Sequence, residues 1–300
     1  MMIKTIDPNE ISQQELHGIL LTAVAPRPIC FASTIDTAGN INLSPFSYFN
    51  VFSSNPPVLI FSPARSGRDN TLKHSHKNVK EVPEVVINIV NHAMVEQMSL
   101  ASTAYKKGVN EFIKAGFTPM ASELIKPPRV GEAPVAFECS VNKVIELAQT
   151  PGAGNLIICE VKRIHINKDY LTENTLDTQK LDLVGRMGGS WYIRSNGDAL
   201  FEIPKPIKTK GIGVDALPES IRESQELTGN NLGRLGNLEA LPDEKTVSAI
   251  ALDDEIQMMH KKLVESPKKF RTQLHWLAKR ILEEGETEKA MAVLLFADKL

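Results

Sequence analysis

Short apolar runs separated by turn-forming residues fill the first two hundred positions of the chain, and this pattern favours β-strands joined by turns. We expect strands over residues 29–35, 41–52, 58–61, 84–90, 135–146 and 156–166. Few of the connections between these runs are long enough for the crossovers that parallel pairing needs. The sequence therefore predicts a mainly β fold with some helix, built around an antiparallel barrel of about six strands.

The composition changes near residue 204, where strand-like segments give way to helical ones. Of the 18 prolines, 13 precede that position, and residues 203–213 are typical of a linker. We expect helices over residues 70–79, 93–102, 109–115, 216–227 and 244–298, the last as two helices broken near Pro267. The chain is therefore predicted to consist of a barrel domain over residues 1–204 and a linker with an α-helical extension over residues 205–300.

Apolar residues recur at helical spacing in this extension and form one stripe. The stripe includes Leu274, Leu277, Ile281, Val293, Leu294 and Phe296. Such a surface is too large to remain in water. We expect the extension to be structural, with the stripe packed either on its own barrel or across a dimer.

The net charge and the cysteines argue against several classes of protein. A formal net charge of −2 is not typical of a protein that holds nucleic acid or an anionic membrane. No apolar run approaches the roughly 18 residues of a membrane span, and the N-terminus lacks the apolar segment of a secretory signal. The three cysteines lie in separate apolar runs, so we expect reduced core cysteines in a cytoplasmic protein.

Four consecutive residues, Ser47, Tyr48, Phe49 and Asn50, combine small polar and aromatic side chains in the second expected strand. A planar heterocycle is bound by such a mixture, because its rim needs hydrogen bonds and its faces need apolar contact. A plain strand with one polar face is the alternative that the residue types leave open.

A basic loop over residues 62–75 follows the next short strand and leads into an expected helix. Ser62 ends the strand, and Arg68, Lys73 and Ser75 follow it. Cations, hydroxyls and free amides at a helix N-terminus suit a phosphate monoester. The loop is not a Walker A sequence, and the chain has no GxGxxG in a βαβ setting. The alternative is a solvated basic loop, but a phosphate site beside a heterocycle site would be a nucleotide or flavin site.

A third segment, residues 183–192, contains three glycines, Arg186, Trp191 and Tyr192. Glycine lets a backbone approach a ligand closely, arginine can bind an anion, and an aromatic ring can cover a ligand ring. A loop with core aromatics is the alternative. The histidines form no cluster with carboxylates or cysteines, so no metal site is predicted.

Taken in order, several segments give the chain a family resemblance. They are Pro26-Arg27-Pro28-Ile29, the segment 42–50, Asn55-Pro56-Pro57, the basic loop 62–75, Asn110-Glu111-Phe112, Glu138-Cys139 and Gly185-Arg186-Met187-Gly188-Gly189. Over roughly residues 10–200 the chain resembles the flavin reductase-like family with an FMN-binding split barrel, which includes flavoredoxin-type proteins. The resemblance implies a six-stranded split barrel and a homodimer with FMN near the subunit interface.

The resemblance also implies which residues bind FMN. The S-F-F-N-type strand of the family falls on Ser47, Tyr48, Phe49 and Asn50, which would line the isoalloxazine and the ribityl chain. Ser62 matches the polar residue that ends the next strand in the family.

The phosphate motif of the family, K-D-T, falls on Lys73, His74 and Ser75, with His74 in place of the acid and Ser75 in place of the threonine. Arg68 would share the phosphate, and Arg186 matches the arginine of the late G-R-x-G-G motif.

The implied activity is transfer of a hydride from NAD(P)H to bound FMN. The electrons would then pass to free flavin, to a metal complex or to a partner oxygenase. Since the flavin supplies the redox chemistry, no catalytic base is predicted. One alternative is an FMN-binding redox carrier or sensor without steady NAD(P)H turnover. Another is a pyridoxamine-phosphate oxidase-like enzyme, which would need a second phosphate pocket that the sequence does not show.

Overall fold

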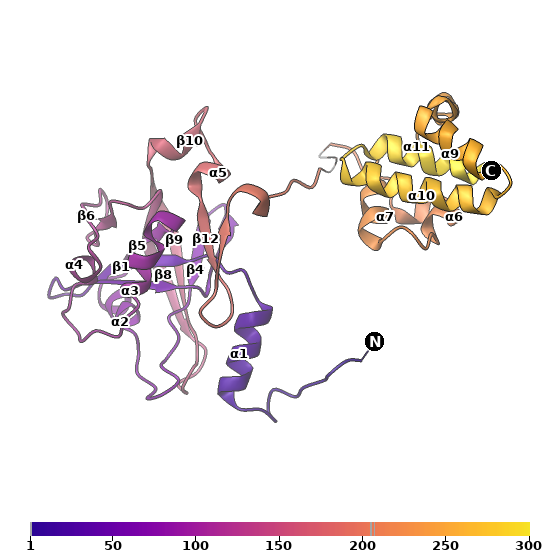
Figure 1. Ribbon diagram of the computed structural model, residues 1–300. Coiled ribbons are helices and arrows are strands. Elements are labelled where there is room, and N and C mark those ends of the chain that lie inside the picture. Colours follow the sequence, from indigo (N-terminus) through magenta and orange to yellow (C-terminus); the bar gives the residue numbers. More distant parts are fainter. Residues whose placement is uncertain (1, 205, 207) are drawn as a thin grey trace. The chain divides into compact units, whose positions relative to one another are not determined.

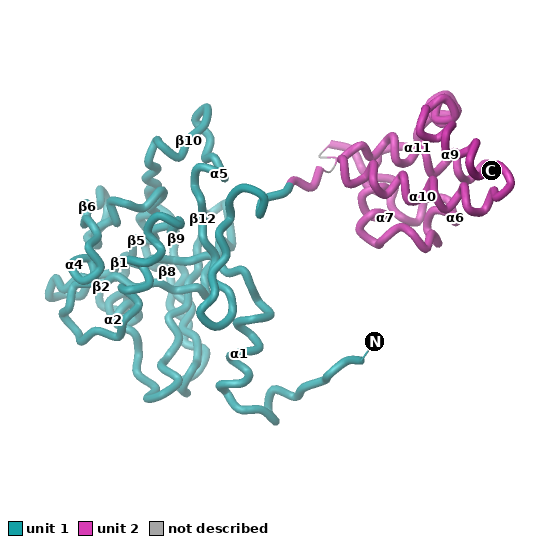
Figure 2. The backbone as a smooth tube through the Cα atoms, in the orientation of Figure 1, with its two compact units in different colours: residues 1–201 teal, residues 202–300 magenta. Residues whose placement is uncertain are grey.

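The computed structural model describes residues 2–204, 206 and 208–300. The chain divides into two compact units, unit 1 over residues 1–201 and unit 2 over residues 202–300 (Figures 1 and 2). Positions 205 and 207 of the expected linker lie outside the described residues. None of the helices within the described ranges is long and apolar enough to cross a membrane.

One antiparallel sheet of seven strands forms the centre of unit 1, in the order β2-β1-β5-β8-β9-β4-β3. The strands are β1 (Cys30–Ile35), β2 (Ile41–Phe46), β3 (Phe49–Ser54), β4 (Pro57–Phe61), β5 (Glu84–Ile89), β8 (Val135–Glu146) and β9 (Asn155–Ile166). Shorter strands pair as β6 (Pro119–Met120) with β7 (Arg129–Val130), β10 (Leu171–Thr172) with β11 (Thr175–Leu176), and β12 (Leu183–Arg186) with β13 (Tyr192–Ser195).

The two strands at opposite ends of this order, β2 and β3, are consecutive in sequence. Only Ser47 and Tyr48 separate them, so the sheet must curl until its ends meet at that bend. This is the geometry of a barrel left open between β2 and β3. The expected count of six strands was therefore wrong, because the segment 41–52 bends at Ser47 and Tyr48 instead of continuing as one strand.

The helices of unit 1 are short; the first precedes β1, and the others lie between strands in the sequence. They are α1 (Gln13–Ala23), α2 (His74–Glu81), α3 (Val95–Leu100), α4 (Glu111–Ala115) and α5 (Thr178–Leu181). Helix α1 was not predicted from the sequence. It begins after Ser12, whose Oγ accepts a hydrogen bond from Glu15 N at 3.1 Å. The helix expected from residue 70 begins only at His74, because the residues before it form a turn.

Alternate residues of β1 belong to two different cores. Phe31 packs with side chains of α3 and α4, whereas Cys30 and Ala32 belong to the core that includes Phe61 and Ile157. All three cysteines are buried and free of disulfides. Burial raises the pKa of the Cys139 thiol to about 12, so this thiol stays protonated at neutral pH.

Unit 2 is entirely helical apart from its loops. Its helices are α6 (Glu219–Arg222), α7 (Gly229–Leu235), α8 (Glu244–Ala249), α9 (Asp254–Leu263), α10 (Pro267–Glu283) and α11 (Thr287–Asp298). Leu274, Leu277, Ile281, Val293 and Leu294 are buried together in its own core. The apolar stripe therefore needs neither the barrel nor a dimer to cover it, which corrects the expectation from sequence.

Candidate functional site

Arg27, which directly precedes Pro28, joins three elements of unit 1. Its guanidinium donates from Nη1 to Leu21 O (2.5 Å) and Val24 O (2.6 Å) at the end of α1. Nη2 donates to Met187 O at 3.1 Å, and Nε donates to Ser47 Oγ at 3.3 Å. Four of the five guanidinium N–H groups are thus used. The side chain therefore holds together α1, the bend at Ser47 and Tyr48 (the Ser47 bend) and the loop 187–191 between β12 and β13 (the glycine-rich loop).

Arg186 lies at the end of β12, beside Arg27. Its guanidinium donates to Gly189 O at 2.7 Å and Trp191 O at 3.3 Å, and it stacks on the Tyr192 ring at 4.5 Å from the centroid. The arginine therefore shapes its own loop and places a cation beside the Ser47 bend.

The bend itself is fixed from the neighbouring strand. Ser62 N donates to Tyr48 O at 2.8 Å, and Phe49 pairs with Phe61 in the β3–β4 ladder. The side chains of Tyr48 and Asn50 are exposed, while Ser47 and Phe49 are half-buried. The predicted ring-binding residues therefore form a continuous strip that leaves polar and aromatic groups accessible.

Ser62 is buried at the end of β4, where the β8–β9 hairpin approaches it. Its Oγ accepts from Asn155 N at 3.0 Å, and Asn155 Nδ2 donates to Pro63 O at 2.8 Å. A Cβ on Gly154 would lie 2.9 Å from Ser62 Oγ, so glycine is needed there. The Oδ1 atom of the fully buried Asn155 has no hydrogen-bond partner in the described structure.

The basic loop is folded rather than extended. Ser66 N donates to Thr71 O at 2.9 Å, and Arg65 N donates to Ala153 O at 2.8 Å. Hydrogen bonds from Ser66 and Thr71 lower the pKa of Asp69 to about 2, so this carboxylate is charged and serves the turn. The Arg68 side chain is exposed and makes no side-chain hydrogen bond within the described residues.

The N-terminus of α2 follows this loop and presents unused donors. Lys73 is the N-cap residue and provides no side-chain cap, and the backbone N–H groups of His74, Ser75 and His76 have no acceptor in the described part of the chain. Ser75 is buried, and its Oγ accepts from Asn42 Nδ2 at 2.8 Å. The hydroxyl hydrogen of Ser75 is still available as a donor.

Helix α1 contacts both the basic loop and the glycine-rich loop. Its Gln13 side chain occupies the space that a Cβ on Gly152 would need and also lies near Gly67 in the basic loop. Nine residues further on, Thr22 lies against Gly188 in the glycine-rich loop. Because a helix rises about 1.5 Å per residue, the contacts of Gln13 and of Thr22 are about 14 Å apart along α1.

Five cations in this region have no acidic partner. Across the described residues, no carboxylate lies within ion-pair distance of Arg27, Arg65, Arg68, Lys73 or Arg186. Burial lowers the pKa of the Arg27 guanidinium, and the nearby Arg186 adds to this effect while Tyr48 opposes it. The region therefore suits an anionic ligand.

Two arginines of this region were missed as site residues by the sequence analysis. Arg27 was recognised only as part of a family motif, and Arg65 only as one cation in the loop. Nε of Arg65 is buried without a hydrogen-bond partner in the described structure. The contacts of Arg27 with Ser47 and Met187, which are 20 and 160 positions away, could not be read from the local sequence.

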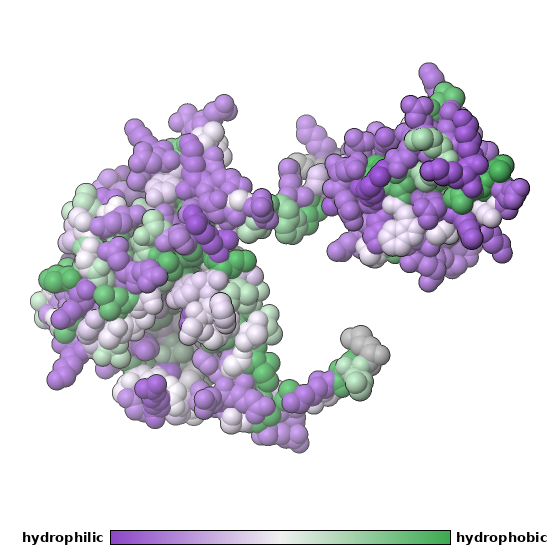
Figure 3. All heavy atoms as spheres, viewed as in Figure 1, coloured by the Kyte–Doolittle hydropathy of each residue, from purple (hydrophilic) through white to green (hydrophobic). Residues whose placement is uncertain are grey.

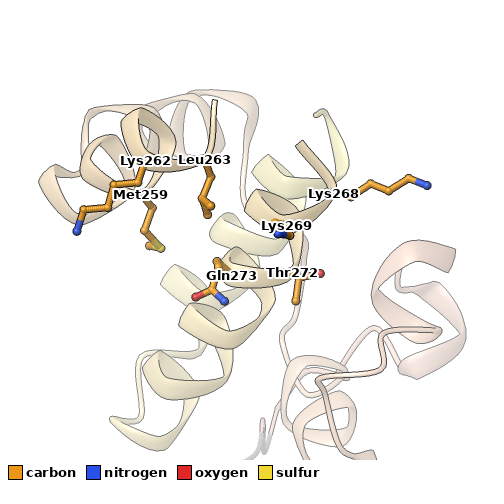
Figure 4. A pocket seen from close by; sticks show the side chains of 7 residues that line it. All are labelled: Met259, Lys262, Leu263, Lys268, Lys269, Thr272 and Gln273. Atoms are coloured by element: carbon orange, nitrogen blue, oxygen red, sulfur yellow. The ribbon is translucent and has the colours of Figure 1, made fainter. Parts of the chain in front are cut away.

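Two concave surfaces of the described structure lie away from these residues. One is in unit 2 between α9 and α10 (Figure 4), and another in unit 1 is lined by residues that include Arg129, Glu132 and His165. Neither contains a predicted flavin-site residue. Those residues instead follow the exposed strip and loops described above.

Comparison with known proteins defines the class to which the chain belongs. The family of the flavin reductase like domain matches residues 23–181, and the chain belongs to that family. The resemblance drawn from the sequence is thereby confirmed. Proteins of this family are flavin-related oxidoreductases, and the antiparallel sheet of unit 1 agrees with their split-barrel fold.

Particular relatives align with about two thirds of the chain. An uncharacterized protein of Aquifex aeolicus is 36% identical over 195 residues, which are 65% of this chain and 97% of the relative. The structure of nitrilotriacetate monooxygenase component B from Bacillus cereus is 27% identical with a TM-score of 0.63, covering 68% of this chain and all of that one. Flavoredoxin of Desulfovibrio vulgaris (Miyazaki F), 20% identical with a TM-score of 0.52 over 69% of this chain and 98% of its own, shares the fold.

Proposed function

We propose that the protein binds FMN without a covalent bond, accepts a hydride from NAD(P)H on it, and passes the electrons to free flavin or to a partner oxygenase. When bound, FMN would supply the redox chemistry, and the protein would bind, orient and electrostatically tune it. No side-chain acid or base is assigned.

The observation that carries this proposal is the uncapped N-terminus of α2. A helix N-terminus attracts an anion through its free N–H groups and its dipole. Lys73 and Arg68 add unpaired cations, and Ser75 adds a hydroxyl donor. These groups together fit the monoester phosphate that distinguishes FMN from riboflavin.

The rest of the cofactor would extend along α1 towards Arg27. Ser62, at the end of β4, would accept hydrogen bonds from ribityl hydroxyls. Ser47, Tyr48, Phe49, Asn50 and Arg186 would contact the ring system. Arg27 would act as a positioning residue, because it holds the bend and the loop that carry these contacts.

A homodimer is proposed because apolar side chains remain exposed around the same region. Val51 and Phe52 on the edge strand β3 are each 63% exposed, Val24 at the end of α1 is 62% exposed, and Trp191 is 78% exposed. Apolar (green) side chains are visible on the surface of unit 1 among hydrophilic ones (Figure 3). A second subunit would cover these residues.

The partner oxygenase is suggested by a relative. The Bacillus cereus structure is of a monooxygenase component, which by its name works with another component. We extend this role to the present chain as one of two electron acceptors, the other being free flavin.

Three measurements test the proposal. The purified protein should show a flavin absorption band, and the apo-protein should bind FMN more tightly than riboflavin. Stopped-flow mixing of the FMN-loaded protein with NADH and NADPH should bleach the flavin rapidly. Tight FMN binding without bleaching would favour the redox carrier, and a colourless protein that binds no FMN would refute the proposal.

A further inference from the structure

A groove between α9 and α10 of unit 2 has an apolar floor and a basic rim. It encloses about 550 Å³, and Met259 and Leu263 point from α9 towards α10 (Figure 4). Lys262 and Lys268 extend outward at its sides, and Lys269 also lines it. No carboxylate is among its lining residues.

The positive charges at this groove are electrostatically unfavourable for α10, the helix that carries most of them. Lys268, Lys269 and Arg271 lie in the first turns of α10, where the helix dipole is positive and repels cations. Ser266 precedes the helix without capping it through its side chain. The backbone N–H groups of Lys268 and Lys269 have no acceptor in the described part of unit 2. These lysines therefore do not stabilise the free helix, and an incoming carboxylate would satisfy both the amides and the ammonium groups.

We propose that this groove binds an acidic, amphipathic segment of a partner protein. Carboxylates of that segment would pair with Lys262, Lys268 and Lys269, while its apolar side chains would pack on Leu263 and on Met259, a flexible residue that adapts to different partners.

Nucleic acid fits the groove less well than such a peptide. The lining residues include neither an arginine, which would grip phosphates in two places, nor an aromatic ring on which a base could stack. Residues 201–300 carry 15 Lys and Arg against 17 Asp and Glu, so the unit as a whole does not attract polyanions.

The groove lies outside the part of the chain that the family shares. The family match ends at residue 181, and the Aquifex relative aligns over 97% of its own length with 195 residues of this chain. That relative has no room for a second unit of this size. Partner binding at the groove would therefore be a property of unit 2 that the family domain does not provide. It does not depend on whether unit 1 binds FMN.

The test uses the full chain and a labelled peptide of about 14 residues with Leu on one helical face and Glu on the other. Fluorescence anisotropy should show binding that weakens with added salt. A matched peptide with Gln in place of Glu should bind at least about tenfold more weakly. The double variant Lys268→Glu/Lys269→Glu should lose at least about tenfold in affinity for the Glu peptide.

A second double variant, Lys210→Glu/Lys245→Glu, is the matched control, because it changes the net charge equally at exposed positions outside α9 and α10. It should bind the Glu peptide like the parent, and circular dichroism and melting should show both variants folded. Equal affinity for the two peptides, or unchanged binding by a folded Lys268→Glu/Lys269→Glu variant, would overturn the proposal. So would tighter binding of single-stranded DNA or anionic phospholipid vesicles than of the Glu peptide.

Discussion

Arg27 and Arg186 are joined through both of their backbone groups: Arg27 N donates to Arg186 O at 3.0 Å, and Arg186 N donates to Arg27 O at 2.8 Å. The two residues lie near opposite ends of the sequence of unit 1, and these hydrogen bonds bring their two cationic side chains into the same region. Since neither has a carboxylate partner among the described residues, the pair has an electrostatic cost that an anion could relieve. A ligand that binds there should therefore also stabilise the fold.

We predict that Arg27→Ala lowers the free energy of unfolding by about 2–4 kcal/mol, because it removes four partly buried hydrogen bonds of a charged group. Urea unfolding followed by circular dichroism measures this. Arg163→Ala is the control, because Arg163 forms only an exposed ion pair with Glu123 and should cost at most about 1 kcal/mol. Similar losses in both variants would contradict a positioning role for Arg27.

We predict that Lys73→Ala weakens FMN binding about tenfold or more, because a charge-assisted hydrogen bond contributes roughly 1.5–3 kcal/mol. Lys126→Ala, on an exposed loop away from the α2 N-terminus, should leave affinity unchanged. Flavin fluorescence quenching measures both dissociation constants, and the parent should prefer FMN to riboflavin by a similar factor. If Lys73→Ala binds like the parent, another cation, such as Arg68 or Arg65, holds the phosphate.

Local patterns in the sequence predicted most of the sheet, but they could not show how its ends meet. The aromatic run from Phe46 to Phe49 has strand composition throughout, and the bend within it depends on bonds from Arg27 and Ser62. Helix α1 was missed because its apolar residues remain largely exposed, so they mark no face for burial.

In the candidate site, too, the sequence predicted only those contacts whose residues are close together in the chain. The basic loop and the residues at the start of α2 are adjacent in sequence and could be proposed as a phosphate site. The role of Arg27 could not, since Met187 lies 160 residues away. Nor could the pairing of Ser75 with Asn42, which are 33 positions apart on different elements.

We predict that Gly154→Ala destabilises unit 1 by about 1–3 kcal/mol, because its Cβ would lie 2.9 Å from Ser62 Oγ. In a Ser62→Ala background the clash is removed, so the added cost of Gly154→Ala should be smaller. Urea unfolding of both single variants and the double variant gives this coupling energy. Purely additive costs would show that Ser62 does not set the requirement for glycine.

We predict that stability falls as the pH drops below about 6.5, the ordinary pKa of histidine. Burial lowers the pKa of His76 and of His275 in the folded protein, with Glu146 opposing the shift at His76 and Glu226 opposing it at His275. The unfolded chain then binds more protons than the folded one in this range, so stability rises with pH and is complete above the unfolded pKa.

Melting temperatures between about pH 7.5 and pH 5.5 measure this dependence. His275→Gln should flatten the decline for unit 2, whereas His17→Gln, at an exposed position of α1, should not alter it. An identical slope in the parent and in His275→Gln would exclude His275 as a source of the acid sensitivity.

We predict that a chain ending at Phe201 folds and binds FMN within about twofold of the full chain, because separate cores support the two units. The buried apolar residues of α10 and α11 pack within unit 2, and the core residues of unit 1 form clusters of their own. Calorimetry should show the loss of one unfolding transition with the other retained, and flavin titration should give the affinity. A truncated chain that aggregates, melts lower or changes its oligomeric state would show instead that unit 2 supports the barrel.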